Sequence, residues 1–168
     1  MNLPRHYPAI PAIALLLTMN SLASEKTLFD FETATNTAAW QSVNDDVMGG
    51  VSASNFRVTN GVAVSRGEVS LENNGGFASV RSLPARHDLA GCNAFVIRVR
   101  GDGHRYKFTA RTDRTLDSAI CQFAFPTRKG EWVEHRLLLK DFVPTFRGRV
   151  LPGEAPLDPA KNPSLNNQ

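Results

Sequence analysis

Apolar and polar residues alternate in short runs along most of the chain. The runs end at glycine, asparagine, aspartate or proline, and no long stretch has the spacing of an amphipathic helix. We predict strands over residues 27–32, 51–58, 61–65, 68–71, 77–83, 94–100, 105–112, 119–126 and 132–139. Short strands at this spacing indicate an all-β sandwich.

Two turn sequences predict hairpins. Residues 59–61 are Thr-Asn-Gly, and asparagine and glycine tolerate the positive φ that a tight turn requires. Residues 101–104, Gly-Asp-Gly-His, separate the runs 94–100 and 105–112, so we expect those two strands to pair.

That pairing would gather basic side chains on one face of the sheet. The set is Arg98, Arg100, Arg105, Lys107 and Arg111. Like charges on neighbouring strands are destabilising, so acidic side chains of the chain, an anionic ligand or an acidic partner surface should offset them. The alternative is a solvated face on which the long side chains extend into water.

The first 23 residues have the pattern of a secretory signal peptide. Arg5 and His6 precede the apolar run 9–17, and the small-residue site 21–23 follows. The apolar run is shorter than the about 20 residues that a membrane span requires, and no later segment approaches that length. We expect an exported, periplasmic or extracellular protein with no membrane span after signal removal. An uncleaved anchor or a transit peptide is the alternative.

The rest of the chain fits one domain, which we place at residues 24–159, followed by a disordered tail at 160–168. Of the 168 residues, 42% are hydrophobic, which is enough for a core. The 19 basic and 16 acidic residues give a net charge of +3, and removing 1–23 takes away only Arg5. This charge does not indicate binding to nucleic acid.

The chain has two cysteines, Cys92 and Cys121. In an oxidising compartment they could form one disulfide, and two buried free thiols are the alternative, because sequence does not fix their Cα separation. Neither has the Cys/His spacing of a metal site, so we expect no metal and no cofactor.

One loop holds several oxygen-bearing side chains. Residues 44–46, Asn-Asp-Asp, lie beside Gly49 and Gly50. Such a loop could fold back through hydrogen bonds from side chains to backbone, contact a ligand or partner, or bind Ca²⁺, although its oxygens are too few for a full calcium cage.

Further polar and aromatic side chains lie at strand ends and in loops. The candidate contact residues for a partner or ligand are Asn44, Asp45, Asp46, Arg81, Arg100, Asp102, Arg105, Tyr106, Trp132, Arg147 and Arg149. Arg147 and Arg149 offer planar, bidentate recognition of carboxylates. Trp132 and Tyr106 could stack on a sugar, or they could pack in the core.

Catalytic patterns do not appear in the sequence. It contains no Gly-x-Ser-x-Gly elbow, and no spacing suggests a Cys–His pair. Asp45 and Asp46 are adjacent, so in an extended segment they would point to opposite faces and could not act together on one bond. We predict a protein that is not an enzyme.

Four dense segments resemble the complex I intermediate-associated protein 30 family. They are NDDVMGGVS at 44–52, GGFASVR at 75–81, GDGHRYKF at 101–108 and DFVPTFRGR at 141–149. Trp40 precedes the first segment and Gly-Glu-Trp at 130–132 precedes the last. The resemblance extends from about residue 29 to about residue 159.

The resemblance implies a galactose-binding-like jelly-roll β-sandwich and a non-enzymatic, chaperone-like role in assembling respiratory NADH:ubiquinone oxidoreductase through a protein partner. An exported carbohydrate-binding module of the same architecture, with a glycan as ligand, is the alternative. Members of the family usually continue past 157–159 into another apolar strand, whereas residues 161–168 are polar. We therefore expect the last strand to be missing, which would leave a sheet edge open or covered by a second copy.

Overall fold

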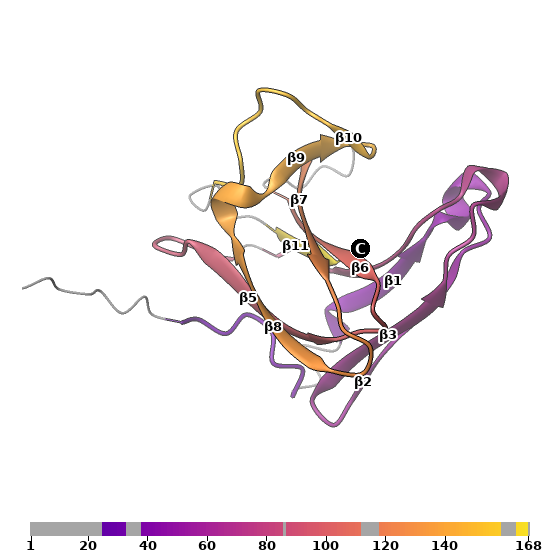
Figure 1. The fold of residues 1–168 in the computed structure, drawn as a ribbon, viewed down its shortest axis with the longest axis horizontal. Helices are drawn as coiled ribbons and strands as arrows, with labels where there is room; N and C mark the ends of the chain where they lie inside the picture. Colours follow the sequence, from indigo (N-terminus) through magenta and orange to yellow (C-terminus); the bar gives the residue numbers. More distant parts are fainter. Residues whose placement is uncertain (1–24, 33–37, 86, 112–117, 159–163, 168) are drawn as a thin grey trace, which may run out of the picture.

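The computed structural model describes residues 25–32, 38–85, 87–111, 118–158 and 164–167, and the segment predicted as a signal peptide lies outside them (Figure 1). The described chain is all-β. The strands are β1 (Trp40–Asn44), β2 (Ala53–Thr59), β3 (Val62–Glu68), β4 (Ala78–Ser82), β5 (Ala94–Arg100), β6 (Arg105–Arg111), β7 (Ile120–Pro126), β8 (Trp132–Leu138), β9 (Val143–Phe146), β10 (Arg149–Val150) and β11 (Ser164–Asn167). Short 3₁₀ helices are η1 (Asp45–Met48), η2 (Glu72–Asn74) and η3 (Leu139–Asp141).

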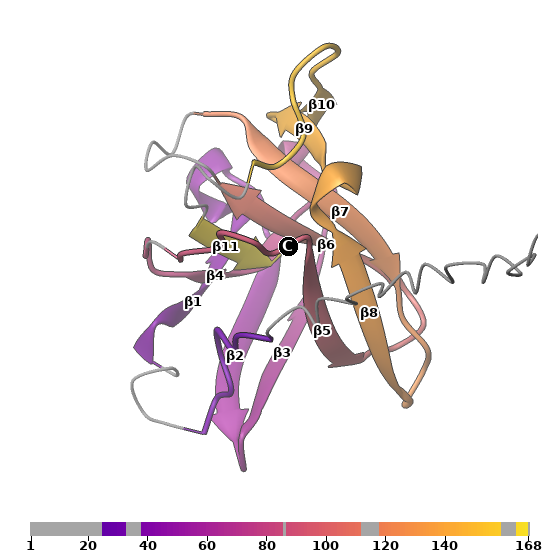
Figure 2. The same ribbon diagram turned by 90° about the vertical axis from the view of Figure 1, so that its left-hand side faces the viewer.

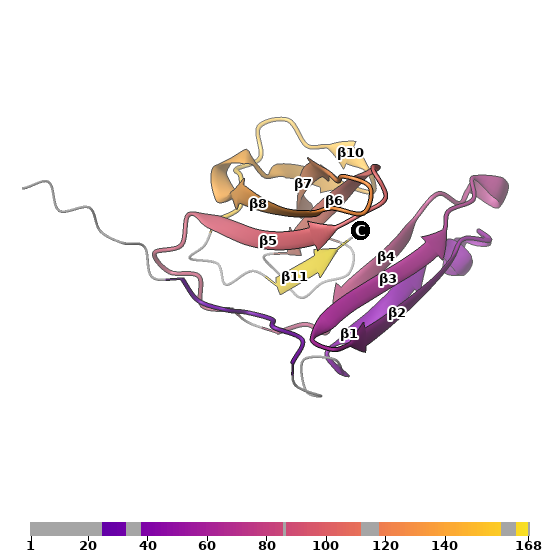
Figure 3. The ribbon, with the colours of Figure 1, turned by 60° about the horizontal axis from the view of Figure 1, so that its bottom comes forward.

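One large sheet forms the first layer, in the order β1-β4-β11-β6-β7-β9-β10. Two strand pairs, β2–β3 and β5–β8, form the second layer. Figure 3 shows β2–β3 beside β1 and β4, and β5–β8 beside β6 and β7, while Figure 2 shows the same division from the side. The fold is therefore consistent with a β-sandwich whose second layer is divided into two parts.

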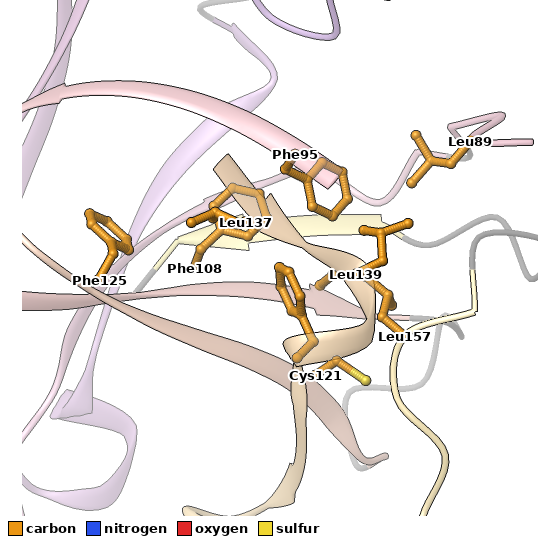
Figure 4. Packing of buried hydrophobic residues seen from close by; sticks show 10 residues of the cluster. Leu89, Phe95, Phe108, Cys121, Phe125, Leu137, Leu139 and Leu157 are labelled. Carbon is orange, nitrogen blue, oxygen red and sulfur yellow. The ribbon is translucent and has the colours of Figure 1, made fainter. Parts of the chain in front are cut away.

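The main core lies between β5–β8 and the β6–β7 part of the large sheet. Phe142 is almost fully buried, and its ring centroid lies 5.8 Å from that of Phe95, 6.0 Å from that of Phe108 and 5.5 Å from that of Phe123. Figure 4 shows the neighbouring side chains gathered in this space. A second aromatic group joins the other half of the sandwich, where Trp40 stacks on Phe56 at 6.2 Å.

Most predicted strands are confirmed, with shifted ends. The runs at 51–58, 61–65, 77–83, 94–100, 105–112, 119–126 and 132–139 correspond to β2 through β8. The predicted strand at 68–71 is wrong, because β3 ends at Glu68 and η2 begins at Glu72. Residues 27–32 are not a strand either. β1 and β9 were not predicted.

The predicted pairing of 94–100 with 105–112 is wrong. β5 pairs with β8, and β6 pairs with β7, so the turn between β5 and β6 passes from one layer to the other. Thr127 holds this turn: its hydroxyl donates to the carbonyl of His104 at 2.8 Å and accepts from the amide of Gly103 at 3.1 Å. Arg98 and Arg100 therefore lie in a different sheet from Arg105, Lys107 and Arg111.

The expected absence of a last strand, and the disorder predicted for residues 160–168, are wrong at Ser164–Asn167. These residues form β11, which pairs antiparallel with β4 on one side and with β6 on the other. Their sequence, Ser-Leu-Asn-Asn, has no strong strand propensity. The strand forms because β4 and β6 each offer an edge of backbone donors and acceptors that β11 can satisfy.

The disulfide considered for Cys92 and Cys121 is not formed. Cys121 lies within the main core, and Cys92 is half-buried against the same cluster. A cysteine outside a disulfide packs as a small apolar side chain, which is how both residues contribute here.

Replacing Phe142 tests the packing of the main core. We expect Phe142→Ala to lower the free energy of unfolding by about 3–5 kcal/mol, because the cavity would open among three aromatic neighbours. Val150→Ala is the matched control, since Val150 is exposed in β10 and should change stability by less than about 0.5 kcal/mol. Urea denaturation measures the free energy of unfolding of both variants. An equal decrease in the two variants would show that Phe142 is not at the centre of the core.

Candidate functional site

Asp45 lies at the end of β1 and is the centre of a buried hydrogen-bond network. Its carboxylate accepts from the Ser52 amide at 3.0 Å and the Ser52 hydroxyl at 2.7 Å. It also accepts from the amides of Gly76 at 2.6 Å and Phe77 at 3.3 Å. The side chain is 1% exposed, so these four donors replace water around the charge.

Two glycines give the carboxylate its space. A Cβ atom at Gly50 or at Gly75 would overlap the Asp45 carboxylate, so neither position accepts a side chain without rearrangement. Gly49 caps η1 in the left-handed region at φ +82°, where glycine is favoured. One glycine of each Gly-Gly pair in the first two motif segments is thus explained by the space that the Asp45 carboxylate needs.

Ser52 extends the network to the end of β3. Its hydroxyl accepts from the Ser70 amide at 3.0 Å while donating to Asp45. The start of β2, the end of β3 and the loop before β4 are therefore tied to one carboxylate. We call this end of the molecule, residues 45–52 and 69–77, the tip; it lies at the upper right of Figure 1.

The hydrogen bonds favour the ionised form of Asp45. They lower its pKa from 3.8 to about 2, with the Ser52 hydroxyl as the largest cause and the Gly76 amide next. At neutral pH the tip therefore contains a buried negative charge, compensated by backbone and hydroxyl dipoles.

Asn44 and Asp46, on either side of Asp45 in the sequence, are less buried than Asp45. Asn44 is half-buried and its side-chain oxygen accepts from the Ser54 hydroxyl at 2.5 Å, which joins β1 to β2. Asp46 is exposed. Of the three predicted contact residues in this loop, Asn44 and Asp45 are engaged inside the protein and Asp46 faces solvent.

The outer face of β5–β8 carries exposed arginines around two exposed apolar side chains. In the register, Val96 is opposite Arg136, Arg98 is opposite Glu134, and Arg100 is opposite Trp132. Trp132 is 45% exposed and Val96 is 48% exposed. We call these six residues the β5–β8 face; it holds three guanidinium groups and one carboxylate.

Trp132 and Arg98 interact directly on the β5–β8 face. The guanidinium carbon of Arg98 lies 5.3 Å from the centroid of the Trp132 ring, within the range of a cation–π contact. Glu134, opposite Arg98, offsets part of the positive charge. The structure thus brings together Arg100 and Trp132 from the predicted set.

Arg81 lies on β4, on the face of the large sheet that points away from β2–β3 and β5–β8. It is half-buried, and its Nε donates to the Ser79 hydroxyl at 3.1 Å. Burial, followed by the charge of Arg111, lowers its pKa. Arg105, at the start of β6, is exposed on the same side of the sheet. These arginines are separate from the β5–β8 face.

Asp102, His104 and Tyr106 surround the turn between β5 and β6. The Asp102 carboxylate accepts from the His104 amide at 3.0 Å and lies 3.0 Å from His104 Nδ1. These interactions lower the pKa of Asp102 to about 2, and the hydrogen bond from the His104 amide is the largest cause. The Tyr106 ring stacks on that of Phe125, with 6.3 Å between the ring centroids. Burial is the main cause that raises the pKa of Tyr106, and Asp102 adds to it. Because Asp102 and His104 are exposed, this group shapes a turn on the surface.

Arg147 lies in the turn between β9 and β10, Arg149 is the first residue of β10, and both are exposed. Arg147 has a positive φ of 48°, and its guanidinium lies 5.2 Å from the ring centroid of Phe146. This turn does not place either residue on the β5–β8 face, which belongs to another sheet.

In the part of the chain that the structure describes, no group of three or more His, Cys, Asp and Glu side chains could hold a metal ion. Among the same residues, no helix has the length and apolarity to cross a membrane.

The comparison with known families agrees with the four motif segments. The model of the family described as complex I intermediate-associated protein 30 matches residues 29–165. The chain belongs to this family. No curated protein matches the sequence.

The complex I intermediate-associated protein 30 match continues to residue 165, within the segment predicted to be a disordered tail and within β11. The motif that carried the resemblance, residues 44–52, contains Asp45, Gly50 and Ser52, which the structure joins in one network. These three motif residues are therefore explained by the hydrogen bonds and the space that the Asp45 carboxylate requires.

Sequence reasoning missed several residues of the tip and of the β5–β8 face. Ser52 was not singled out, although it follows the Gly-Gly pair in the motif. Val96 and Arg136 were not among the candidate contact residues, because β5 was expected to pair with residues 105–112. No local signal indicates that residues 132–138 lie opposite β5, since the pairing is between distant segments.

Neutralising Asp45 tests the network at the tip. We expect Asp45→Asn to lower the urea midpoint at neutral pH, because an amide NH₂ would face N–H donors. The folded pKa, about 2, is below the about 3.9 of an unfolded aspartate, so the ionised carboxylate stabilises the fold above about pH 4. That stabilisation is lost as pH falls toward about 2.

The variant should therefore show a smaller loss of stability between about pH 5 and pH 2.5 than the native chain. Asp102, whose pKa is lowered in the same direction, would account for part of the remaining slope. Asp46→Asn is the control, because Asp46 is exposed. An unchanged pH dependence in Asp45→Asn would contradict the network.

Proposed function

We propose that this chain is a non-enzymatic protein-binding domain that acts as an assembly factor, and that the β5–β8 face contacts its partner. The observation that carries the proposal is the exposed Trp132, held by Arg98, on a face that also exposes Val96. The family supports the assembly role, because its description refers to intermediates of complex I.

The composition of the β5–β8 face suits a protein partner. Tryptophan and arginine are the residue types most often responsible for binding energy at protein interfaces. Arg98 restrains the indole before binding, which reduces the conformational entropy lost on association. With Arg98, Arg100 and Arg136 against Glu134, the face favours a partner surface that combines acidic and apolar side chains.

A carbohydrate-binding role receives no specific support from the described residues. The indole of Trp132 is engaged by the guanidinium of Arg98. Tyr106, the other aromatic considered, stacks on Phe125. Protein binding is therefore the function that the geometry supports best.

We further propose that the protein is exported and that its sandwich has the connectivity of a galactose-binding-like jelly roll. Export is supported by the signal-like pattern of residues 1–23. The jelly roll is supported by the family match and by two layers of mainly antiparallel strands. An exported member would meet its partner outside the cytoplasm, so its partner need not be complex I.

Cross-linking in the source cells, followed by purification through a tag, tests the proposed function. The cross-linked protein would be produced in pure form and its affinity measured directly. We expect Trp132→Ala to weaken binding at least about 30-fold, which corresponds to about 2 kcal/mol, typical of a residue that dominates an interface. Arg57→Ala is the control, because Arg57 is exposed on β2, outside the β5–β8 face.

Equal affinity of Trp132→Ala and the native chain would overturn this placement of the interface. Trp132 is partly exposed, so circular dichroism and the urea midpoint should show that the variant remains folded.

A further inference from the structure

Three apolar side chains project into solvent at the tip. Leu71 is 81% exposed, Val69 is 54% exposed and Val51 is 53% exposed. They come from the two segments that the hydrogen bonds of Ser52 and Asp45 hold together: Val51 precedes Ser52, and Val69 and Leu71 flank Ser70. We call Val51, Val69 and Leu71 the tip patch. Single exposed apolar residues are common, but three on adjoining segments form a surface that favours contact with another molecule.

The backbone under the tip patch is held in an uncommon conformation. Just after Leu71, Asn73 and Asn74 have φ values of 53° and 59°, and Gly76 has a φ of 140°. The bond from the Gly76 amide to Asp45 fixes the end of this segment. Asparagine and glycine adopt positive φ at little cost, so these residues let the segment turn sharply without strain.

The exposure of Leu71 is not needed for packing. Its Cδ2 atom lies near Gly76, but the side chain lies mostly in water, so a polar residue would suit the loop equally well. The network therefore presents an apolar side chain on a loop whose conformation is already fixed. Such an arrangement reduces the entropy lost when a partner binds.

The charge around the tip patch indicates what it contacts. Asp46, Glu68 and Glu72 are exposed beside the patch. Residues 44–52 and 66–77 together contain four acidic residues and one basic residue, Arg66, although the whole chain has a net charge of +3. This local negative charge is complementary to a basic surface and repels the anionic surface of a lipid membrane.

We propose that the tip patch docks a polypeptide segment that combines basic and apolar side chains, contributed by a protein partner. The apolar side chains contact Leu71, Val69 and Val51, and the basic side chains lie against Asp46, Glu68 and Glu72. This inference rests on the proposed protein-binding function and adds a second contact, separate in position and opposite in charge from the β5–β8 face.

Selection from a random peptide library displayed on phage tests the proposal. Phage would be selected on the immobilised native protein after depletion on Leu71→Ser. We expect the recovered peptides to contain lysine or arginine together with apolar residues. Synthetic versions should bind Leu71→Ser at least tenfold more weakly than the native chain, while Val150→Ser, altered at an exposed valine of β10, should bind them like the native chain.

Backbone amide resonances identify where the peptides bind. The amides of Val51, Val69 and Leu71 should shift on titration, and the Gly76 amide in Leu71→Ser should keep its native position, which shows that the loop is intact. Failure to recover peptides that depend on Leu71, or recovery of acidic peptides, would overturn the proposal. Leu71-dependent binding to vesicles of anionic phospholipid would also overturn it, in favour of a membrane contact.

The cross-linked partner separates failure of this inference from failure of the proposed function. If Trp132→Ala weakens partner binding but Leu71→Ser does not, the proposed function stands and the tip patch is not a docking site. If neither variant weakens partner binding, both proposals fail. Weakening by both variants supports two contacts on one partner.

Discussion

One buried carboxylate holds together the end of the molecule where three connections meet. Asp45 follows β1, Ser52 precedes β2, and Gly76 precedes β4, and all three are joined through the Asp45 side chain. A charge inside a protein is stable only when dipoles or opposite charges replace its water. Here four N–H and O–H donors do so, and Gly50 and Gly75 leave room for the carboxylate.

The same hydrogen-bond network links the motif at residues 44–52 to the exposed tip patch. Because Asp45 faces inward, its contribution to binding would be indirect: it fixes the loop that exposes Leu71 and leaves Asp46 in solvent. The β5–β8 face depends on a different constraint, the main core around Phe142, which holds β5–β8 against β6 and β7. Two surfaces of opposite charge thus rest on two separate structural centres, which suits a domain that holds more than one part of an assembly.

The sequence predicted most strands because alternation of apolar and polar residues depends only on local burial. It predicted that the loop at residues 44–46 could fold back on itself, and Asp45 confirms that option. It did not predict the pairing of β5 with β8, because the tight turn at 101–104 resembles a hairpin while the chain there changes layers.

The sequence analysis also missed β11, whose four residues are ordered by the edges of β4 and β6. The exposure of Leu71 was unpredictable, since an apolar residue in a short run normally indicates burial.

The pKa of Asp45 is the most direct test of the buried hydrogen-bond network. Carbon-13 labelling of aspartate side chains allows the carboxyl resonance of Asp45 to be followed as pH is lowered while the protein remains folded. The structure predicts a pKa of about 2 for this group. A midpoint near the about 3.9 of an unperturbed aspartate would contradict the buried network and, with it, the fixed loop that presents the tip patch.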